Sequence, residues 1–220
     1  DVGALNMETT GAPPVPHYSI IQMAGDALAA FIADNGGEAQ ISFVDDDIPG
    51  DMLSGFSFRG PTPGNLANLT KPDITAPGDD VYSAAPSGYV GMGGTSMSGP
   101  QVAGGGALVG SVQPDWTATE IKSAIMMTAE KAGTKDGVWG SGPWDADDVG
   151  SGRMDLSKAA LAGLVMHETR ANFLAANPSS AGDVRTLNLP ALRDMSCTPS
   201  RTWTRTVRNT LDEPTSWSTS

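Results

Sequence analysis

The chain has 220 residues, of which 39% are hydrophobic and 17% are charged, and it contains 27 glycines and 16 prolines. These values are typical of a soluble globular protein with many turns and argue against full disorder. Thirteen basic residues against 25 acidic ones give a formal charge of −12, which disfavours nucleic acid and anionic membrane surfaces as partners.

The cysteine count and the hydropathy pattern exclude further classes. Cys197 is the single cysteine, so no disulfide can form within the chain. No apolar run approaches the roughly 20 residues that a membrane-spanning helix needs, so no span is expected. The start at Asp1 does not resemble a signal peptide, as in a processed or excised chain. The adjacent carboxylates of residues 45–47 lack further spaced oxygen ligands, so a solvated loop is favoured there, and neither a metal nor a cofactor is expected.

The first quarter of the chain is expected to contain a helix between two short strands. Apolar residues recur at helical spacing from Ala24 to Ile32, and the glycines after Asn35 end this pattern. Residues 19–21 and 39–44 are predicted strands. From 55 to 77, glycine and proline punctuate short apolar pieces, which indicates loops joining buried strands.

The central part predicts a strand followed by two helices. Residues 89–92 are strand-like, and Gly93 and Gly94 end the strand. The Ala-, Val- and Gly-rich residues 98–112 predict a helix that is buried on every side. Thr117 is a predicted N-cap of the next helix, and Glu120 completes its capping box. The inner face of that helix is expected to consist of Ile121, Ala124, Ile125 and Thr128.

A loop and then a β-rich tail are expected after these helices, with the helical periodicity fading after about residue 162. A loop is predicted over residues 133–148, where Trp139 and Trp144 are expected to pack underneath rather than to form a binding surface. Further on, the composition shifts toward Asn, Thr, Arg and Ser. Residues 187–192 and 202–207 are predicted strands of a separate β domain, the second with a period-two edge pattern.

Ser96 stands where a tight glycine turn meets the start of a helix. A serine hydroxyl is a poor nucleophile, and it needs an exposed position, a base and donors for an oxyanion. The helix start offers free N–H groups and a partial positive charge. On this fragment alone, helix capping by the Gly-Thr-Ser step remains the favoured alternative. A phosphate-binding loop is disfavoured because its lysine is missing.

Four motifs follow one another along the middle of the chain. They are residues 55–61 (GFSFRGP), 71–78 (KPDITAPG), 94–100 (GTSMSGP) and 150–160 (GSGRMDLSKAA). In this order they resemble the catalytic domain of the subtilisin-like serine proteases, the subtilases of peptidase family S8. The resemblance implies an α/β fold, part of the subtilisin-like three-layer arrangement with a parallel sheet between helices, flanked by β-rich segments.

The resemblance also implies a division into three domains. Residues 1–46 would be the end of a protease-associated insert, and residues 47–166 would be the C-terminal half of the catalytic domain. Residues 167–220 would begin a fibronectin-III-like β-sandwich. Such a protein is expected to be secreted and to act on polypeptides.

The resemblance assigns roles to the residues around the third motif. Ser96 would be the acylated nucleophile, and its own N–H would be one oxyanion donor. The substrate backbone would lie along Gly91, Gly93, Gly94 and Thr95. Met97 would be an oxidisable neighbour of the nucleophile. Gln101 replaces a histidine that is usual in the family but is not its general base.

The rest of a subtilase triad is missing from the sequence. The family order of Asp, His and then Ser places both partners before Ser96. His17 lacks the Gly-Thr that follows the family's catalytic histidine, and His167 lies after the nucleophile. No aspartate has the family's Asp-Thr-Gly or Asp-Ser-Gly setting, and the oxyanion asparagine should also lie upstream.

The expected function is therefore that of a serine endopeptidase fragment. Its catalytic Asp and His would belong to the remainder of the parent protease, so the isolated chain is predicted to be inactive and of marginal stability. The alternative is a non-catalytic peptide-binding or interaction module derived from a subtilase. An α/β-hydrolase esterase is disfavoured, because Ser98 stands where the last glycine of its Gly-x-Ser-x-Gly elbow belongs.

Overall fold

The computed structural model describes residues 22–36, 50–137 and 140–217. The chain divides into two units, Asp1–Ile48 and Pro49–Ser220, and each is described by itself.

The first unit contains the predicted helix. α1 spans Gln22–Asp34. Asn35 follows it and donates from its side-chain amide to the carbonyl of Phe31 at 2.8 Å, which satisfies one of the free carbonyls at the helix end. The predicted strands at 19–21 and 39–44, the carboxylates of residues 45–47 and His17 lie outside the described residues.

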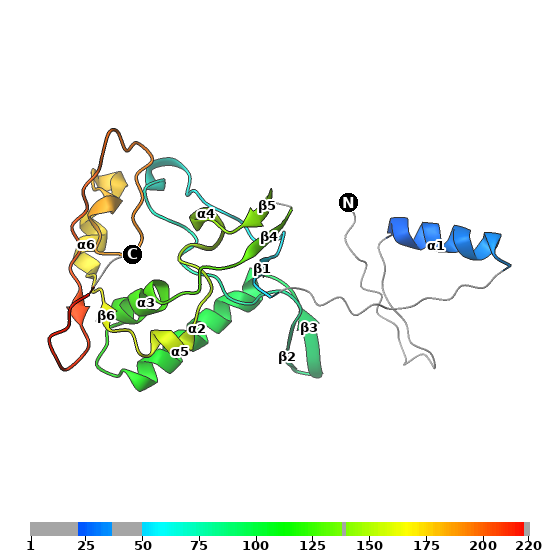
Figure 1. The fold of residues 1–220 in the computed structure, drawn as a ribbon, viewed down its shortest axis with the longest axis horizontal. Helices are drawn as coiled ribbons and strands as arrows, with labels where there is room; N and C mark the ends of the chain where they lie inside the picture. The colour runs from blue at the N-terminus through cyan, green and yellow to red at the C-terminus, as the bar shows by residue number, and fades with distance from the viewer. Residues whose placement is uncertain (1–21, 37–49, 138–139, 218–220) are drawn as a thin grey trace. The chain divides into compact units, whose positions relative to one another are not determined.

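The second unit is a mixed α/β structure, which confirms the predicted fold class (Figure 1). Helices α2 to α6 span Thr95–Val112, Ala118–Met127, Ala146–Val149, Leu156–Ala159 and Arg170–Ala175. Strands β1 to β7 span Met52–Leu53, Val81–Ala85, Gly88–Met92, Thr134–Gly137, Gly140–Pro143, Leu164–Val165 and Arg208–Asn209. Turns of 3₁₀ helix, η1 to η3, span Gly64–Leu66, Pro178–Ser180 and Val184–Thr186.

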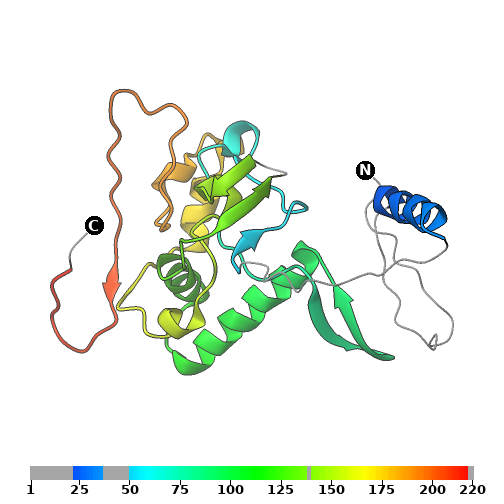
Figure 2. The same cartoon turned by 45° about the vertical axis from the view of Figure 1, so that its right-hand side comes forward.

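The strands form three small sheets. In the order β1-β4-β5, the β1-β4 pair is parallel and the β4-β5 pair is antiparallel. β2 and β3 form an antiparallel hairpin, in which Val81 pairs with Met92 and Ala85 with Gly88. The predicted strand at 89–92 is thus confirmed as part of β3. The hairpin extends from the N-terminal end of α2 (Figure 2).

The main core forms where α2, α3 and α5 meet. Val109, Ile125 and Ala159, one from each helix, are almost fully buried against one another. The predicted capping box of α3 is confirmed: Thr117 accepts from the N–H of Glu120, and the Glu120 carboxylate accepts the N–H of Thr117 at 2.8 Å.

The expectation that residues 98–112 form a helix buried on every side is wrong. The helix forms, but Gly105 and Val109 are its buried residues. Leu108 is 61% exposed and Val112 is 59% exposed. In this chain α3 and α5 pack against one side of α2 (Figure 1). Leu108 and Val112 lie outside that contact and remain exposed.

The prediction of a loop over residues 133–148 is also wrong, because this region contains β4, β5 and α4. Trp144 nevertheless packs as expected, with its ring against the backbone of Gly133 and its indole N–H donating to the carbonyl of Thr134 at 2.7 Å. Trp139 lies outside the described residues.

The strands predicted at 187–192 and 202–207 do not form. A side chain replaces the ladder: the amide of Asn188 donates to the carbonyl of Thr206 and accepts its N–H, both at 2.8 Å. Burial still alternates along this segment, since Trp203 and Arg205 are half-buried while their neighbours are exposed. The period of two is therefore present without the strand.

Gly142 and Gly152 both have a positive φ, but only Gly152 has close neighbours, so alanine variants at the two positions distinguish the cost of backbone strain from the cost of a steric clash. Gly152 has φ +123, and a Cβ there would lie 2.1 Å from the carbonyl oxygen of Glu130. Gly142 has φ +116, with nothing within 4 Å. We expect Gly142→Ala to cost about 1 to 2 kcal/mol of unfolding free energy, and Gly152→Ala at least about 3 kcal/mol, because backbone must also move. Denaturant unfolding of a folded form that contains this unit measures the difference, and equal costs would contradict it.

Candidate active site

The turn before α2 is built from main-chain hydrogen bonds. Gly94 has φ +149, a conformation that favours glycine, and its N–H donates to the carbonyl of Gly78 at 2.7 Å. The N–H of Met97 donates back to the carbonyl of Gly94 at 2.9 Å. The first-turn N–H groups of Thr95 and Ser96 have no helical carbonyl to bond, so they remain for a ligand.

Ser96 is the second residue of α2, and it is exposed. No side chain caps this helix, because Gly94 is its N-cap, so Ser96 does not cap it. The 18-residue helix has no acidic residue in its first turn, and its partial positive charge lies at the end that carries the serine. Pro100 lacks an N–H, so the carbonyl of Ser96 receives no helical bond from that position.

The second motif, residues 71–78, packs against this turn. Gln101 donates its side-chain amide to the carbonyl of Pro77 at 2.9 Å. A Cβ on Gly78 would lie 3.0 Å from the carbonyl oxygen of Gly94 and 3.1 Å from the Cβ of Ser98. The two motifs are therefore in contact, and the bond from Gln101 is a further link between α2 and the second motif.

The predicted substrate-binding residues lie in one stretch of backbone that ends at Ser96. Gly91, Gly93 and Thr95 are exposed, and Gly94 is half-buried. They run from the end of β3 into the first turn of α2, next to the serine in sequence and in space. The roles assigned to these residues and to Ser96 remain predictions.

Two carboxylates beside this stretch escaped the sequence reasoning. Asp79 lies against Gly93, with its oxygen 2.9 Å from where a Cβ would stand, and it accepts the hydroxyl of Ser54 at 2.7 Å. Asp80 lies against Gly91 in the same way, at 3.2 Å. The sequence signal that could have identified Asp79 and Asp80 is their position directly after the second motif and before the strand that begins at Val81.

A buried carboxylate holds the first motif in place. The side chain of Asp148 is fully buried, and it accepts from Arg59 at 2.8 Å and from Lys135 at 2.9 Å. It also accepts the N–H of Asp145 at 2.8 Å. Arg59 belongs to residues 55–61, so this cluster fixes the first motif to α4.

The same cluster shifts the pKa values of Arg59, Lys135 and Asp145. Hydrogen bonding to Asp148 raises the pKa of Arg59 and of Lys135, against the effect of burial. Burial would raise the pKa of Asp145, but the N–H of Asp147 and the charge of Arg59 outweigh it and lower that pKa. These directions favour the charged forms of Arg59, Lys135 and Asp145.

No base partners Ser96 in the described part of the chain. His167, the histidine that the structure describes, has its Nδ1 2.9 Å from the hydroxyl of Thr117 and belongs to the α3 cap. The described residues also contain no group of three His, Cys, Asp or Glu side chains that could hold a metal ion. Among the same residues, no helix is long and apolar enough to cross a membrane.

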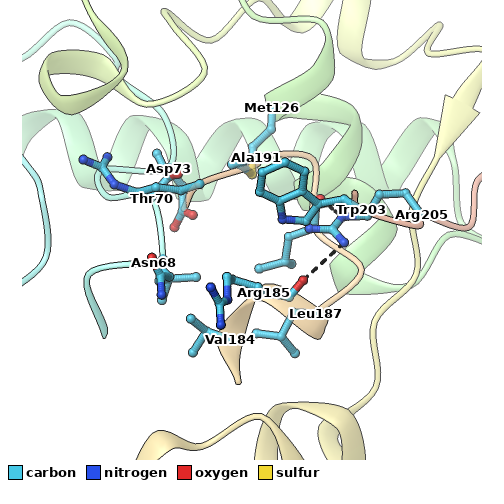
Figure 3. A pocket seen from close by; sticks show the side chains of 13 residues that line it. Asn68, Thr70, Asp73, Met126, Val184, Arg185, Leu187, Ala191, Trp203 and Arg205 are labelled. Atoms are coloured by element: carbon cyan, nitrogen blue, oxygen red, sulfur yellow. Dashed lines mark hydrogen bonds between the residues drawn. The ribbon is translucent and has the colours of Figure 1, made fainter. Parts of the chain in front are cut away.

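A small cavity lies away from the predicted site residues. It is a cavity of about 10 Å³ between α3 and the C-terminal tail, residues 167–217, with Asp73, Met126, Trp203 and Arg205 in its wall (Figure 3). This volume holds about one water molecule, so it is too small for a substrate. The indole nitrogen of Trp203 is buried there without a hydrogen-bond partner among the described residues. Burial lowers the pKa of Arg205, with Glu168 opposing it.

The fold and the site together define a mixed α/β protein that presents a serine in the first turn of a helix, an arrangement known from serine hydrolases. The sequence model of the subtilase family matches residues 2–151. The chain belongs to this family.

Similar proteins come from plants and bacteria. Subtilisin-like protease SBT1.7 of Arabidopsis thaliana is 30% identical over 215 residues, which cover 86% of this chain and 28% of that protein. Subtilisin-like protease SBT4.3 of the same plant is 33% identical over 188 residues, covering 78% and 24%. Minor extracellular protease Vpr of Bacillus subtilis (strain 168) is 37% identical over 113 residues, covering 48% and 13%. The chain spans about a quarter of the two plant relatives.

The close packing of Gly78 under the turn gives a test of the site's geometry. We expect Gly78→Ala to cost about 1 to 3 kcal/mol of unfolding free energy, because the new methyl group presses on Gly94 and Ser98. Gly99→Ala is the matched control, since nothing lies within 4 Å of its Cβ position. Hydrogen exchange of the bonded amides of Gly94 and Met97 should accelerate in the first variant alone. Unchanged exchange in both would show that the contact does not hold the turn.

Proposed function

We propose that this chain carries the nucleophile of a secreted serine endopeptidase, with Ser96 as the residue that a polypeptide substrate acylates. The observation that carries the proposal is the exposed Ser96 in the first turn of α2, where the N–H groups of Thr95 and Ser96 are free of helical bonds. Family membership supports the reaction class, and the extracellular relative supports secretion.

In the proposed reaction, Ser96 Oγ attacks the carbonyl carbon of the scissile peptide bond. The carbonyl oxygen becomes an anion, which the N–H of Ser96 and the positive end of α2 stabilise. A general base takes the hydroxyl proton and then gives it to the leaving amine, and water later hydrolyses the ester. The exposed backbone of Gly91, Gly93, Gly94 and Thr95 would hold the extended substrate.

We infer that the base comes from the remainder of the parent protease, with the catalytic Asp and the oxyanion asparagine. An apolar groove between α2 and α3 supports this inference. It measures about 340 Å³, and its wall includes Val102, Ile121 and Ile125. Leu108 and Val112 leave further apolar surface exposed on α2. Burying such surface contributes about 25 cal/mol per Å², so a covering partner would stabilise this unit.

Replacement of Ser96 tests the function directly. In the full-length protease, Ser96→Ala should reduce kcat by about 10⁶-fold, because the attacking oxygen is lost. Ser98→Ala is the matched control: its hydroxyl bonds the carbonyl of Thr95 within the same helix, at 3.2 Å, and we expect a loss below tenfold. A fluorophosphonate probe followed by mass spectrometry should label Ser96. Turnover that persists in Ser96→Ala would contradict the assignment of Ser96 as the nucleophile. Peptide binding without turnover in the wild type would favour the non-catalytic module.

The stability of the isolated chain tests whether the remainder of the protease covers this apolar surface. We expect the 220-residue chain to bind a hydrophobic dye and to unfold over a broad temperature range, because one side of α2 and the groove are uncovered. The full-length protein should bind far less dye and unfold sharply. A sharp, cooperative transition of the isolated monomer would contradict the inference.

A further inference from the structure

Two tyrosines stand together on the hairpin that leads to Ser96. The rings of Tyr82 and Tyr89 stack with centroids 5.3 Å apart and an angle of 18°. Tyr82 pairs with Gly91 and Tyr89 with Ala84, so the tyrosines are diagonal neighbours on one face of the hairpin. Both are largely exposed, at 74% and 69%. The stacked rings therefore offer an open aromatic surface.

A carboxylate lies on the same face. The oxygen of Asp80 is 3.2 Å from the position where Gly91 would carry a Cβ. Because Gly91 is directly opposite Tyr82, the carboxylate and the aromatic rings share one side of the sheet. Asp79 and Asp80 take part in none of the ion pairs found in the described residues. Residues 79–95 contain no Lys or Arg, so this negative charge is not neutralised locally.

This face is continuous with the proposed path of the substrate. Gly91 is one of the residues expected to hold the substrate backbone, and β3 ends at Met92, four residues before Ser96. Tyr89 lies three residues back along the strand, about 10 Å from Met92. An extended peptide that passes over Gly91 therefore brings a side chain within about four residues of the scissile bond onto Tyr82, Tyr89 and Asp80.

We propose that Tyr82, Tyr89 and Asp80 form a subsite that selects a cationic side chain, arginine or lysine, of the peptide substrate. The inference rests on the proposed function of Ser96. A cation is attracted by the face of a tyrosine ring and by a carboxylate, whereas an apolar side chain would use the rings alone. A second copy of this chain is a poorer occupant, because the chain carries a charge of −12 and would bring further negative charge to the face.

Peptide binding to the full-length protease tests the subsite independently of turnover. In a Ser96→Ala background, fluorescence anisotropy compares peptides that carry arginine or its neutral isostere citrulline at each position within four residues of the scissile bond. At one position, the arginine peptide should bind about tenfold tighter at low salt, with the gain reduced at high salt. Tyr82→Leu with Tyr89→Leu, or Asp80→Asn alone, should reduce this ratio at least threefold.

The controls separate the rings from the fold. Tyr82→Phe with Tyr89→Phe should keep most of the preference, because the ring faces remain, and Ser83→Ala on the opposite face should leave it unchanged. Equal affinity for both peptides at every position, or a preference that survives the Leu and Asn variants, overturns the proposal. A change in oligomeric state in place of peptide affinity also overturns it, in favour of a second copy. Turnover that persists in Ser96→Ala, with the preference intact, would instead count against the proposed role of Ser96 and leave the subsite standing.

Discussion

One main-chain hydrogen bond, from the N–H of Gly94 to the carbonyl of Gly78, joins the second and third motifs, which are separate in the sequence but close in space. It is possible because Gly94 adopts φ +149 and because Gly78 has no side chain to hold the turn away. Everything that makes Ser96 accessible follows from this contact: the strand ends, the chain reverses, and α2 begins with its first amides unpaired. The bond from Gln101 to Pro77 repeats the connection about two turns further along the helix.

Around this turn, the unit relies on buried charges as much as on apolar packing. Its cores are small, with three buried residues in each cluster. Buried carboxylates add links between segments: Asp148 joins the first motif to α4, and Glu120 joins the start of α3 to Arg208 of β7 at 2.7 Å. Glu168 accepts the N–H of Asn188 at 2.6 Å and so fixes the tail. Each carboxylate is satisfied by several donors, which is the condition for burying a charge without a large penalty.

Local signals in the sequence predicted well those features that depend on local chemistry. The capping box at Thr117, the strand at 89–92 and the glycine break before Ser96 all depend on residues that are close in the chain, and all are present. The neighbourhood of the site was less accessible to prediction, since Asp79 and Asp80 acquire their positions only through the hairpin register. The burial of α2 was overestimated because a pattern of small apolar residues states what a helix can bury, whereas contact requires a neighbouring element.

The tail shows how a segment with strand-like alternation can attach to a domain without adding a strand. A carboxamide offers one donor group and one acceptor, as a peptide unit does, so Asn188 matches the main chain of Thr206 at a single point. A full ladder would have left the far edge of the new strand open to pairing with other chains. Arg205 adds side-chain bonds to the carbonyls of Leu189 and Arg185, and strand pairing resumes only at β7, so residues 202–206 join the surface through side chains and add no open strand edge.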